Sequence, residues 1–299
     1  MVQRRKFRNI LSHISSFELI QPDNDNQMTN KELYLDLTAS RGTSLFLGQY
    51  SSKGILFILQ GLGILSRLEK FGLDSISVEI STSQPFKHLL RLTHHWQEKK
   101  FVIAELAVRE GTFGLDDSSG KEEKQLSYSI LMVEWLLIQN PLRHFSRAKP
   151  QLPGQQFPGL GMAGEVCEIL YWMARRRNSD GVMIVPDSLH AAVIYSVEFR
   201  FADPRTAAML KRIQKQLIRR RGLAQTAWAC QEGRIINTVL GETFVWRPAE
   251  MIIPASRRMR DFFHSKQYKT KFRRHLADYD FETEQGFQKN FSPEWKAVS

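Results

Sequence analysis

Two periods of apolar residues alternate along the chain, one typical of β-strands and one typical of α-helices. Strand-like patterns occupy 31–40, 75–80, 87–96, 100–111 and 127–138. Ranges 101–109 and 127–138 flank a polar loop of turn-forming residues, so they predict an antiparallel hairpin with a long tip. The second range is almost continuously apolar, which is typical of a strand covered on both faces. A helix is predicted to start at Ser51 or Ser52 and to end at Gly72.

Helical spacing dominates the second half of the chain. Apolar residues between Val166 and Ala174 recur at intervals of three and four, which predicts a helix over about 160–177. A short buried strand over 180–186 and a helix capped by Asp187 or Ser188 follow it. Two basic helical segments come next, at 204–222 and 254–276. Short strand-like pieces lie between them, at 225–229, 234–239 and 243–246. This order of strands and helices indicates an α/β (α+β) fold.

Three regions of the chain differ in composition. Residues 1–30 are basic, then polar, without a strong period, so we predict an N-terminal arm there. Residues 31–202 carry most of the strands and helices and predict one folded domain. Residues 203–299 predict a basic helical or α+β C-terminal extension.

Charge and cysteine content narrow the class of protein. The chain has 42 Lys and Arg against 31 Asp and Glu, a formal charge of +11, which favours polyanionic partners. Hydrophobic residues make up 42%, which excludes a mainly disordered chain. Cys167 and Cys230 have neither disulfide-framework nor metal-ligand spacing, so we expect a reducing cytoplasmic compartment and no metal. The longest apolar run, 55–68, is too short to span a bilayer, so no membrane span is expected.

A glycine-containing loop lies between the last predicted strand of the hairpin and the helix that follows. It reads Gln156-Phe157-Pro158-Gly159-Leu160-Gly161, and Met162 comes directly after it. A helix N-terminus offers backbone N–H groups without partners and the positive end of a dipole, which together attract phosphate groups. Glycine allows close approach and positive φ values. Gln156 is predicted either to support the loop or to bind an anion through its amide.

This Q-x-x-G-x-G arrangement resembles the acyl-coenzyme A loop of the GNAT superfamily of N-acetyltransferases. The strand and helix over 180–201 resemble that superfamily's fifth strand and next helix, with Ala191 or Ala192, Tyr195 and Phe201 at the matching places. The resemblance covers about 75–201. It implies a mixed, mainly antiparallel central sheet flanked by helices, with coenzyme A bound by N–H groups from Phe157 to Met162. Pro158 has no N–H, and the connection from Ile138 to Gln156 is longer than the superfamily's usual step.

The resemblance implies transfer of an acyl group from acetyl-CoA or another acyl-CoA to an amine. Tyr195 matches the tyrosine that often serves as the acid for the departing thiolate; the alternative is a buried structural aromatic. Glu105 and Glu134 lie within apolar strands and are the candidate bases. For Glu105 a solvent-facing position is the alternative, whereas for Glu134 we predict a cleft, where burial raises a carboxyl pKa.

The sequence does not identify the acceptor or fix the acyl donor. The acceptor is an unidentified amine, and an acidic acyl carrier protein is a second acyl donor that suits the basic surface. The alternative function is a non-catalytic module of the same fold that binds nucleic acid or a protein through its basic face. Four aromatic residues interleave with the cations of 257–274 and predict either base stacking or a core-facing stripe: Phe262, Phe263, Tyr268 and Phe272.

Overall fold

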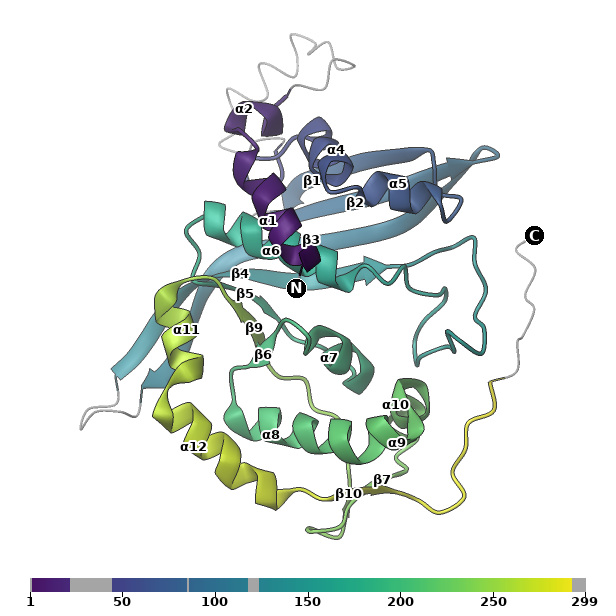
Figure 1. The fold of residues 1–299 in the computed structure, drawn as a ribbon, viewed down its shortest axis with the longest axis vertical. Helices are drawn as coiled ribbons and strands as arrows, with labels where there is room; N and C mark the ends of the chain where they lie inside the picture. The colour runs from purple at the N-terminus through teal and green to yellow at the C-terminus, as the bar shows by residue number, and fades with distance from the viewer. Residues whose placement is uncertain (1, 22–44, 85, 118–123, 292–299) are drawn as a thin grey trace. The chain divides into compact units, whose positions relative to one another are not determined.

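The computed structural model describes residues 2–21, 45–84, 86–117 and 124–291 (Figure 1). It divides into two compact units. Unit 1 comprises Met1–Glu110 and Val133–Leu142, and unit 2 comprises Gly111–Met132 and Arg143–Ser299. Two long strands, β3 (Lys99–Asp117) and β4 (Lys124–Ile138), contribute residues to both units. The domain boundaries predicted after residues 30 and 202 stay predictions.

A mainly antiparallel sheet organises the fold. Its strand order is β1-β2-β3-β4-β5-β9-β6. The pairs β1–β2, β2–β3, β5–β9 and β6–β9 are antiparallel. The remaining strands of this sheet are β1 (Ile76–Gln84), β2 (Lys87–Trp96), β5 (Gly181–Ile184), β6 (Arg200–Phe201) and β9 (Met251–Pro254). The predicted mixed α and β architecture with a large, mainly antiparallel central sheet is therefore confirmed.

The described part of unit 1 contains four helices, and the first two lie where the sequence pattern predicts an irregular arm. Its helices are α1 (Val2–His13), α2 (Ser16–Leu19), α4 (Ser52–Gly61) and α5 (Ile64–Glu69). Phe7, Leu11 and Ile14 are buried at helical spacing. Ser15 and Glu18 form a capping box at the start of α2. The prediction of an irregular segment is thus wrong for the described part of 1–30, while the strand predicted at 31–40 lies outside the described residues.

The helix predicted up to Gly72 is present but divided. Ser51 caps α4 by accepting a hydrogen bond from the N–H of Gly54 at 3.0 Å. Gly63 separates α4 from α5 with a φ of +70°, in the left-handed region that glycine adopts without strain. The strands predicted at 75–80, 87–96 and 100–111 correspond to β1, β2 and β3.

Unit 2 carries the glycine loop and the basic helices. Its helices are α6 (Ala163–Arg176), α7 (Leu189–Tyr195), α8 (Pro204–Ile213), the π-helix η1 (Gln214–Ile218), α9 (Arg219–Arg221), α10 (Leu223–Gln231), α11 (Arg257–His264), α12 (Lys266–His275) and the 3-10 turn η2 (Leu276–Asp278). A small second sheet has the order β10-β7-β8, formed by Phe281–Thr283, Ile235–Asn237 and Glu242–Thr243. The strand-like prediction at 225–229 is wrong because these residues lie in α10, where Ala224, Ala227 and Ala229 are buried.

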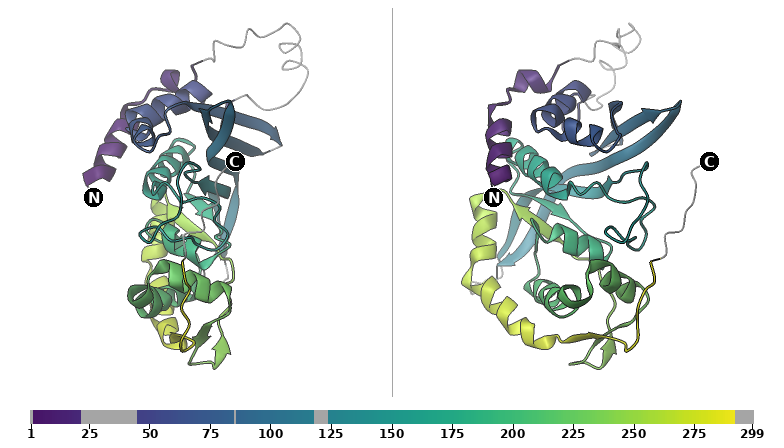
Figure 2. Two further views of the ribbon diagram at one scale, coloured as in Figure 1. Left: turned by 90° about the vertical axis from the view of Figure 1, so that its right-hand side faces the viewer. Right: turned by 45° about the vertical axis from the view of Figure 1, so that its right-hand side comes forward.

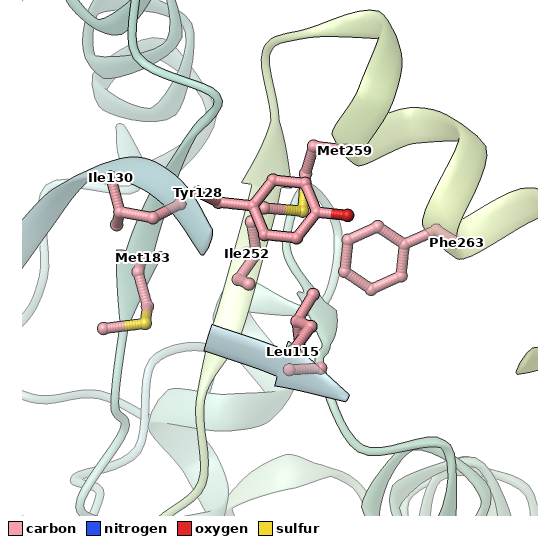
Figure 3. Packing of buried hydrophobic residues seen from close by; sticks show 8 residues of the cluster. Leu115, Tyr128, Ile130, Met183, Ile252, Met259 and Phe263 are labelled. Carbon is pink, nitrogen blue, oxygen red and sulfur yellow. The ribbon is translucent and has the colours of Figure 1, made fainter. Parts of the chain in front are cut away.

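The core of unit 2 joins strands to the C-terminal helices (Figure 3). Tyr128 of β4, Ile252 of β9 and Met259 of α11 lie in one buried cluster. Phe263 belongs to this cluster, and Phe262 and Tyr268 pack against it. For these three aromatics the core-facing alternative is confirmed. Strand β9 pairs with both β5 and β6, so residues 251–254 are part of the central sheet.

Two searches of the described residues gave negative results. No helix among them is both long and apolar enough to cross a bilayer. No group of three or more His, Cys, Asp or Glu side chains in those ranges is arranged to hold a metal ion.

Candidate functional site

The glycine loop of unit 2 leads directly into α6. Leu160 and Met162 are each 4% exposed and anchor the loop from within. Gly161, between them, is exposed and has a φ of +68°. The alternation turns the two apolar side chains inward and brings the backbone at Gly161 to the surface. Gly161 therefore has the conformational role that the sequence pattern predicts for it.

The first turn of α6 offers backbone donors. In the described part of the chain, the N–H groups of Met162, Ala163 and Gly164 donate no hydrogen bond. An ideal Cβ added at Gly164 meets no atom within 4 Å, so this turn faces open space. The helix dipole adds a partial positive charge at the same end. Glu165 is the acidic residue of this turn and partly offsets that charge.

Other loop residues divide between support and exposure. Gln155, rather than Gln156, supports the loop: its Oε1 accepts from the N–H of Leu152 at 3.2 Å. Gln156 is exposed and has no hydrogen bond within the described ranges, which leaves the anion-binding interpretation of its amide. The ammonium of Lys149 donates to the carbonyl of Gly159 at 3.4 Å, so the positive charge of this side chain lies at the loop. The sequence pattern did not indicate Lys149, because only the folded connection brings it beside Gly159.

The remaining loop candidates, Phe157 and Gly159, are half-buried. Gly159 contributes backbone atoms only, among them the carbonyl that accepts from Lys149. Pro158, which has no N–H, is buried between them.

Tyr195 ends helix α7 in the same unit. Burial, with smaller contributions from Cys167 and Asp187, raises the pKa of its phenol to about 12. The ring also makes an edge contact with Phe199, with centroids 5.9 Å apart. The phenol is therefore protonated at neutral pH and available as a donor.

His190, on the first turn of α7, has an electrostatic neighbour of its own. Burial lowers the pKa of its imidazole, and the carboxylate of Asp187 partly opposes this shift. Oγ of Ser188, which caps α7, lies 3.3 Å from Nε2 of His190. The neutral imidazole is thus favoured, which suits a structural role at the helix start.

The two candidate bases lie in unit 1, each in an ion pair. Glu105 pairs with Arg91, its cross-strand partner on β2. Glu134 of β4 lies 2.7 Å from Nε of Arg109 and 3.2 Å from Nζ of Lys87. The structure thus places the two glutamates in one unit and the loop with Tyr195 in the other.

Glu134 lies at a partly exposed surface of unit 1, and the cleft predicted around it stays a prediction. The Glu134 side chain is 33% exposed, and Trp135 beside it is 50% exposed. Strand β4 is covered on both faces at Ile130 and Leu131, which are fully buried, but it has an exposed face at Ser127 and Ser129 and again at Glu134. Ion pairing at a partly exposed surface satisfies this carboxylate. The surface interpretation considered for Glu105 is consistent with its 20% exposure and its contact with Arg91.

Comparisons with known proteins add little to this geometry. No family model matches the chain, and no curated protein matches its sequence. One solved structure, of a point mutant of the AtaT toxin, is similar over 53% of this chain and 77% of its own, with 13% identity and a TM-score of 0.27. At that identity and TM-score, the similarity establishes neither the family nor the activity of this chain.

Proposed function

We propose that the chain is an N-acyltransferase of the GNAT type, which moves an acyl group from an acyl-thioester to an amine. The observation that supports this most directly is the presence, within unit 2, of a glycine loop that leads into a helix N-terminus and of a buried phenol. Gly161 exposes the loop backbone, and the N–H groups of Met162, Ala163 and Gly164 have no acceptor among the described residues. Three adjacent N–H donors at a helix start suit a pyrophosphate.

The loop residues would bind and orient the donor. The N–H groups at the start of α6 would donate hydrogen bonds to the coenzyme A pyrophosphate, and the ammonium of Lys149 adds positive charge at Gly159. Gln156 would add its exposed amide. Gly164 leaves room for the phosphates, because nothing lies within 4 Å of an added Cβ there.

Tyr195 would complete the transfer. The amine nitrogen bonds to the thioester carbonyl carbon, the C–S bond breaks, and the amine loses one proton to a base. The thiolate departs with a hydrogen bond from the Tyr195 phenol, which its raised pKa of about 12 keeps protonated, and takes its own proton from water. Because the phenol is a much weaker acid than a thiol, its main contribution would be a hydrogen bond to the sulfur as negative charge develops.

The proposal does not assign the general base to a single residue. Glu134 and Glu105 stay the predicted candidates, and each would have to release a cationic partner before it accepts a proton. The acceptor amine and the length of the acyl chain are open parts of the same proposal. An acyl carrier protein would deliver the same thioester through its phosphopantetheine arm.

Thermal unfolding with coenzyme A, acetyl-CoA and ATP tests the binding step. A ligand at about 100-fold over its Kd stabilises the folded state by about 2.7 kcal/mol. We expect both coenzyme A ligands to raise the Tm and ATP at equal concentration to leave it unchanged. In Gly164→Trp an indole fills the space in front of the first turn of α6, so the shift should disappear. Ala148→Trp adds the same side chain at an exposed position of the same connection and should retain the shift.

Either of two results would overturn the proposal. One is the absence of a shift with both coenzyme A ligands and with acylated carrier protein. The other is an equal shift in wild type and Gly164→Trp, which would place binding elsewhere. Gly161→Trp is a weaker test, because the positive φ of Gly161 strains any larger residue.

A further inference from the structure

Helix α12 carries a strip of cations along one face. Its sequence contains five Lys or Arg and no acidic residue. Lys266, Lys269, Arg273 and Arg274 follow one another at i, i+3, i+7 and i+8, which places them on the same side of an α-helix. All four are exposed. We refer to these four residues as the α12 strip.

The opposite face of α12 is held by the core of unit 2. Tyr268 packs against the cluster of Figure 3, and its hydroxyl donates to the carbonyl of Phe201 at 2.7 Å. Ser265 caps the helix by accepting from the N–H of Tyr268. Helix α8 packs along α12 (Figures 1 and 2), and Arg212 of α8 donates to the carbonyl of Leu276 at 2.8 Å. The rotation of α12 about its axis is therefore fixed, with the strip facing solvent.

Several basic residues of unit 2 have internal partners, whereas the strip has none among the described residues. Arg258 pairs with Asp180, and Arg260 donates to the carbonyl of Ala255. Arg212 and Arg221 donate to backbone carbonyls. By contrast, the side chains of the α12 strip form no ion pair or hydrogen bond within the described ranges. The arginines with internal partners contribute to the stability of the fold, while the cations of the strip stay unneutralised.

We propose that the α12 strip binds the phosphate backbone of a double-stranded nucleic acid, independently of the sequence. The strip extends from Lys266 to Arg274, eight helical rises or about 12 Å along the helix axis. Phosphates along one strand of a duplex advance about 3.4 Å each, so this length faces roughly three or four phosphates. Contacts from Lys and Arg to phosphate oxygens position a protein on the duplex and carry no sequence information. This inference does not rest on the proposed acyltransferase function.

Three other polyanionic partners fit less well. Single strands bind through aromatic stacking, but Phe262, Phe263 and Tyr268 pack in the core and Phe272 is half-buried. An anionic membrane requires an apolar face that can insert, and the apolar side of α12 is covered by α8 and the cluster. A protein partner binds through buried aromatic or apolar anchors, and the strip consists of Lys and Arg only.

Fluorescence anisotropy with a labelled DNA duplex tests the proposal, using the full chain. With four phosphate contacts, the logarithm of the association constant should fall with the logarithm of salt with a slope of about −3.6. Between about 50 and 200 mM NaCl this slope corresponds to roughly a 100-fold loss of affinity. The variant K266Q/K269Q/R273Q/R274Q should lose most of the affinity at the lower salt and most of the slope.

A matched variant controls for the change in net charge. K70Q/K99Q/R143Q/R147Q also removes two Lys and two Arg, all exposed and without side-chain partners in the described ranges. It should keep the wild-type affinity within a few-fold. K266R/K269R, which preserves the charge of the strip, should bind as wild type does. Circular dichroism and the Tm show that each variant folds.

The experiment has several outcomes that overturn the proposal. An equal loss in the strip variant and the matched variant would mean that only net charge matters. Tighter binding of a single strand than of the duplex would contradict backbone recognition of a double helix. Strip-dependent binding to phosphatidylserine vesicles or to poly-glutamate, without binding to the duplex, would assign the surface to a membrane or an acidic protein.

Discussion

Arg258 on α11 donates a hydrogen bond to the carboxylate of Asp180, the residue before β5. The same carboxylate oxygen accepts from the N–H of Ser129 on β4 at 2.9 Å, and the N–H of Asp180 donates to the carbonyl of Ser129 at 2.6 Å. The guanidinium carbon of Arg258 also lies 4.4 Å from the centroid of the Tyr128 ring. The carboxylate of Asp180 thus connects β4, the start of β5 and helix α11 within unit 2.

This relationship predicts a loss of stability at acid pH. Burial raises the pKa of Asp180, but hydrogen bonds from Arg258, Ser256 and Ser129 lower it more, so the net pKa lies below its usual value. A depressed pKa stabilises the folded state above the unfolded pKa of about 3.9, and that contribution is lost as pH falls through the folded value. Asp180→Asn should cost about 1–3 kcal/mol at neutral pH and reduce the loss below about pH 4.

Urea denaturation at neutral pH and at two acidic pH values measures both effects. Asp261→Asn is the matched control, because Asp261 is 68% exposed and 3.7 Å from Arg257 on the same helix. It should change the free energy of unfolding by less than about 0.5 kcal/mol. Equal costs for Asp180→Asn and Asp261→Asn would show that the carboxylate of Asp180 does not connect these elements energetically.

A close approach between α2 and α4 makes a second prediction. An ideal Cβ at Gly54 would lie 2.2 Å from the carbonyl oxygen of Leu19, a backbone atom that cannot rotate away. Gly54→Ala should therefore destabilise the chain by about 1–3 kcal/mol, although alanine is intrinsically the better helix former. Chemical denaturation followed by circular dichroism measures the change.

Gly61 on the same helix provides the control for that prediction. Its ideal Cβ meets only the side chain of Ile10, at 3.6 Å, which is an ordinary contact. Gly61→Ala should be neutral or stabilising by up to about 1 kcal/mol. If both alanine variants stabilise the chain, α2 and α4 do not approach as closely as the structure indicates.

Local patterns predicted most elements of unit 2 and of the sheet. The alternation over 87–96 and the capping serine before α7 are signals carried by neighbouring residues, and β2 and α7 follow them closely. The helix α1 was missed although Phe7, Leu11 and Ile14 are helically spaced, because the basic residues around them suggested an arm. The strand-like prediction at 225–229 failed because burial of small alanines in α10 outweighs the local preference of Thr226 and Trp228.

The site was predicted less completely than the fold. Gly161 and Tyr195 could be found from the loop and helix patterns, since both depend on local sequence. The environment of Glu134 could not, because its partners Arg109 and Lys87 come from strands β3 and β2. Lys149 and Gln155 carried no sequence signal either. Their roles arise from the path of a long connection that has no periodic pattern.

The ion pairs of Glu134 allow a third prediction that separates chemistry from stability. A partly exposed pair contributes only about 0–1 kcal/mol, so Glu134→Gln should leave the free energy of unfolding almost unchanged. If Glu134 is the base, kcat should fall by roughly 100-fold or more, because general base catalysis contributes about that much. Glu105→Gln is the matched variant in the same sheet, and the larger loss of kcat identifies the base. No loss of kcat in either variant would exclude both glutamates.

The buried phenol of Tyr195 makes the fourth prediction, which concerns alkaline pH. Its folded pKa of about 12 exceeds the ordinary value of about 10, so the unfolded chain releases this proton first as pH rises. The contribution of this phenol to the free energy of unfolding should therefore be fully present below about pH 10. It should decline toward pH 12 with a slope approaching about 1.4 kcal/mol per pH unit.

Tyr195→Phe removes the ionisable group and retains the edge contact of the ring with Phe199. Its free energy of unfolding should match that of wild type near neutral pH and should fall less steeply above about pH 10. Urea denaturation across this range measures the difference in slope, which counts the proton directly. If Tyr195 also hydrogen-bonds the departing sulfur, the same variant should lower kcat while coenzyme A still raises its Tm. A wild-type slope in Tyr195→Phe would show that the phenol is already accessible to solvent, and the role proposed for it in the transfer would lose its electrostatic basis.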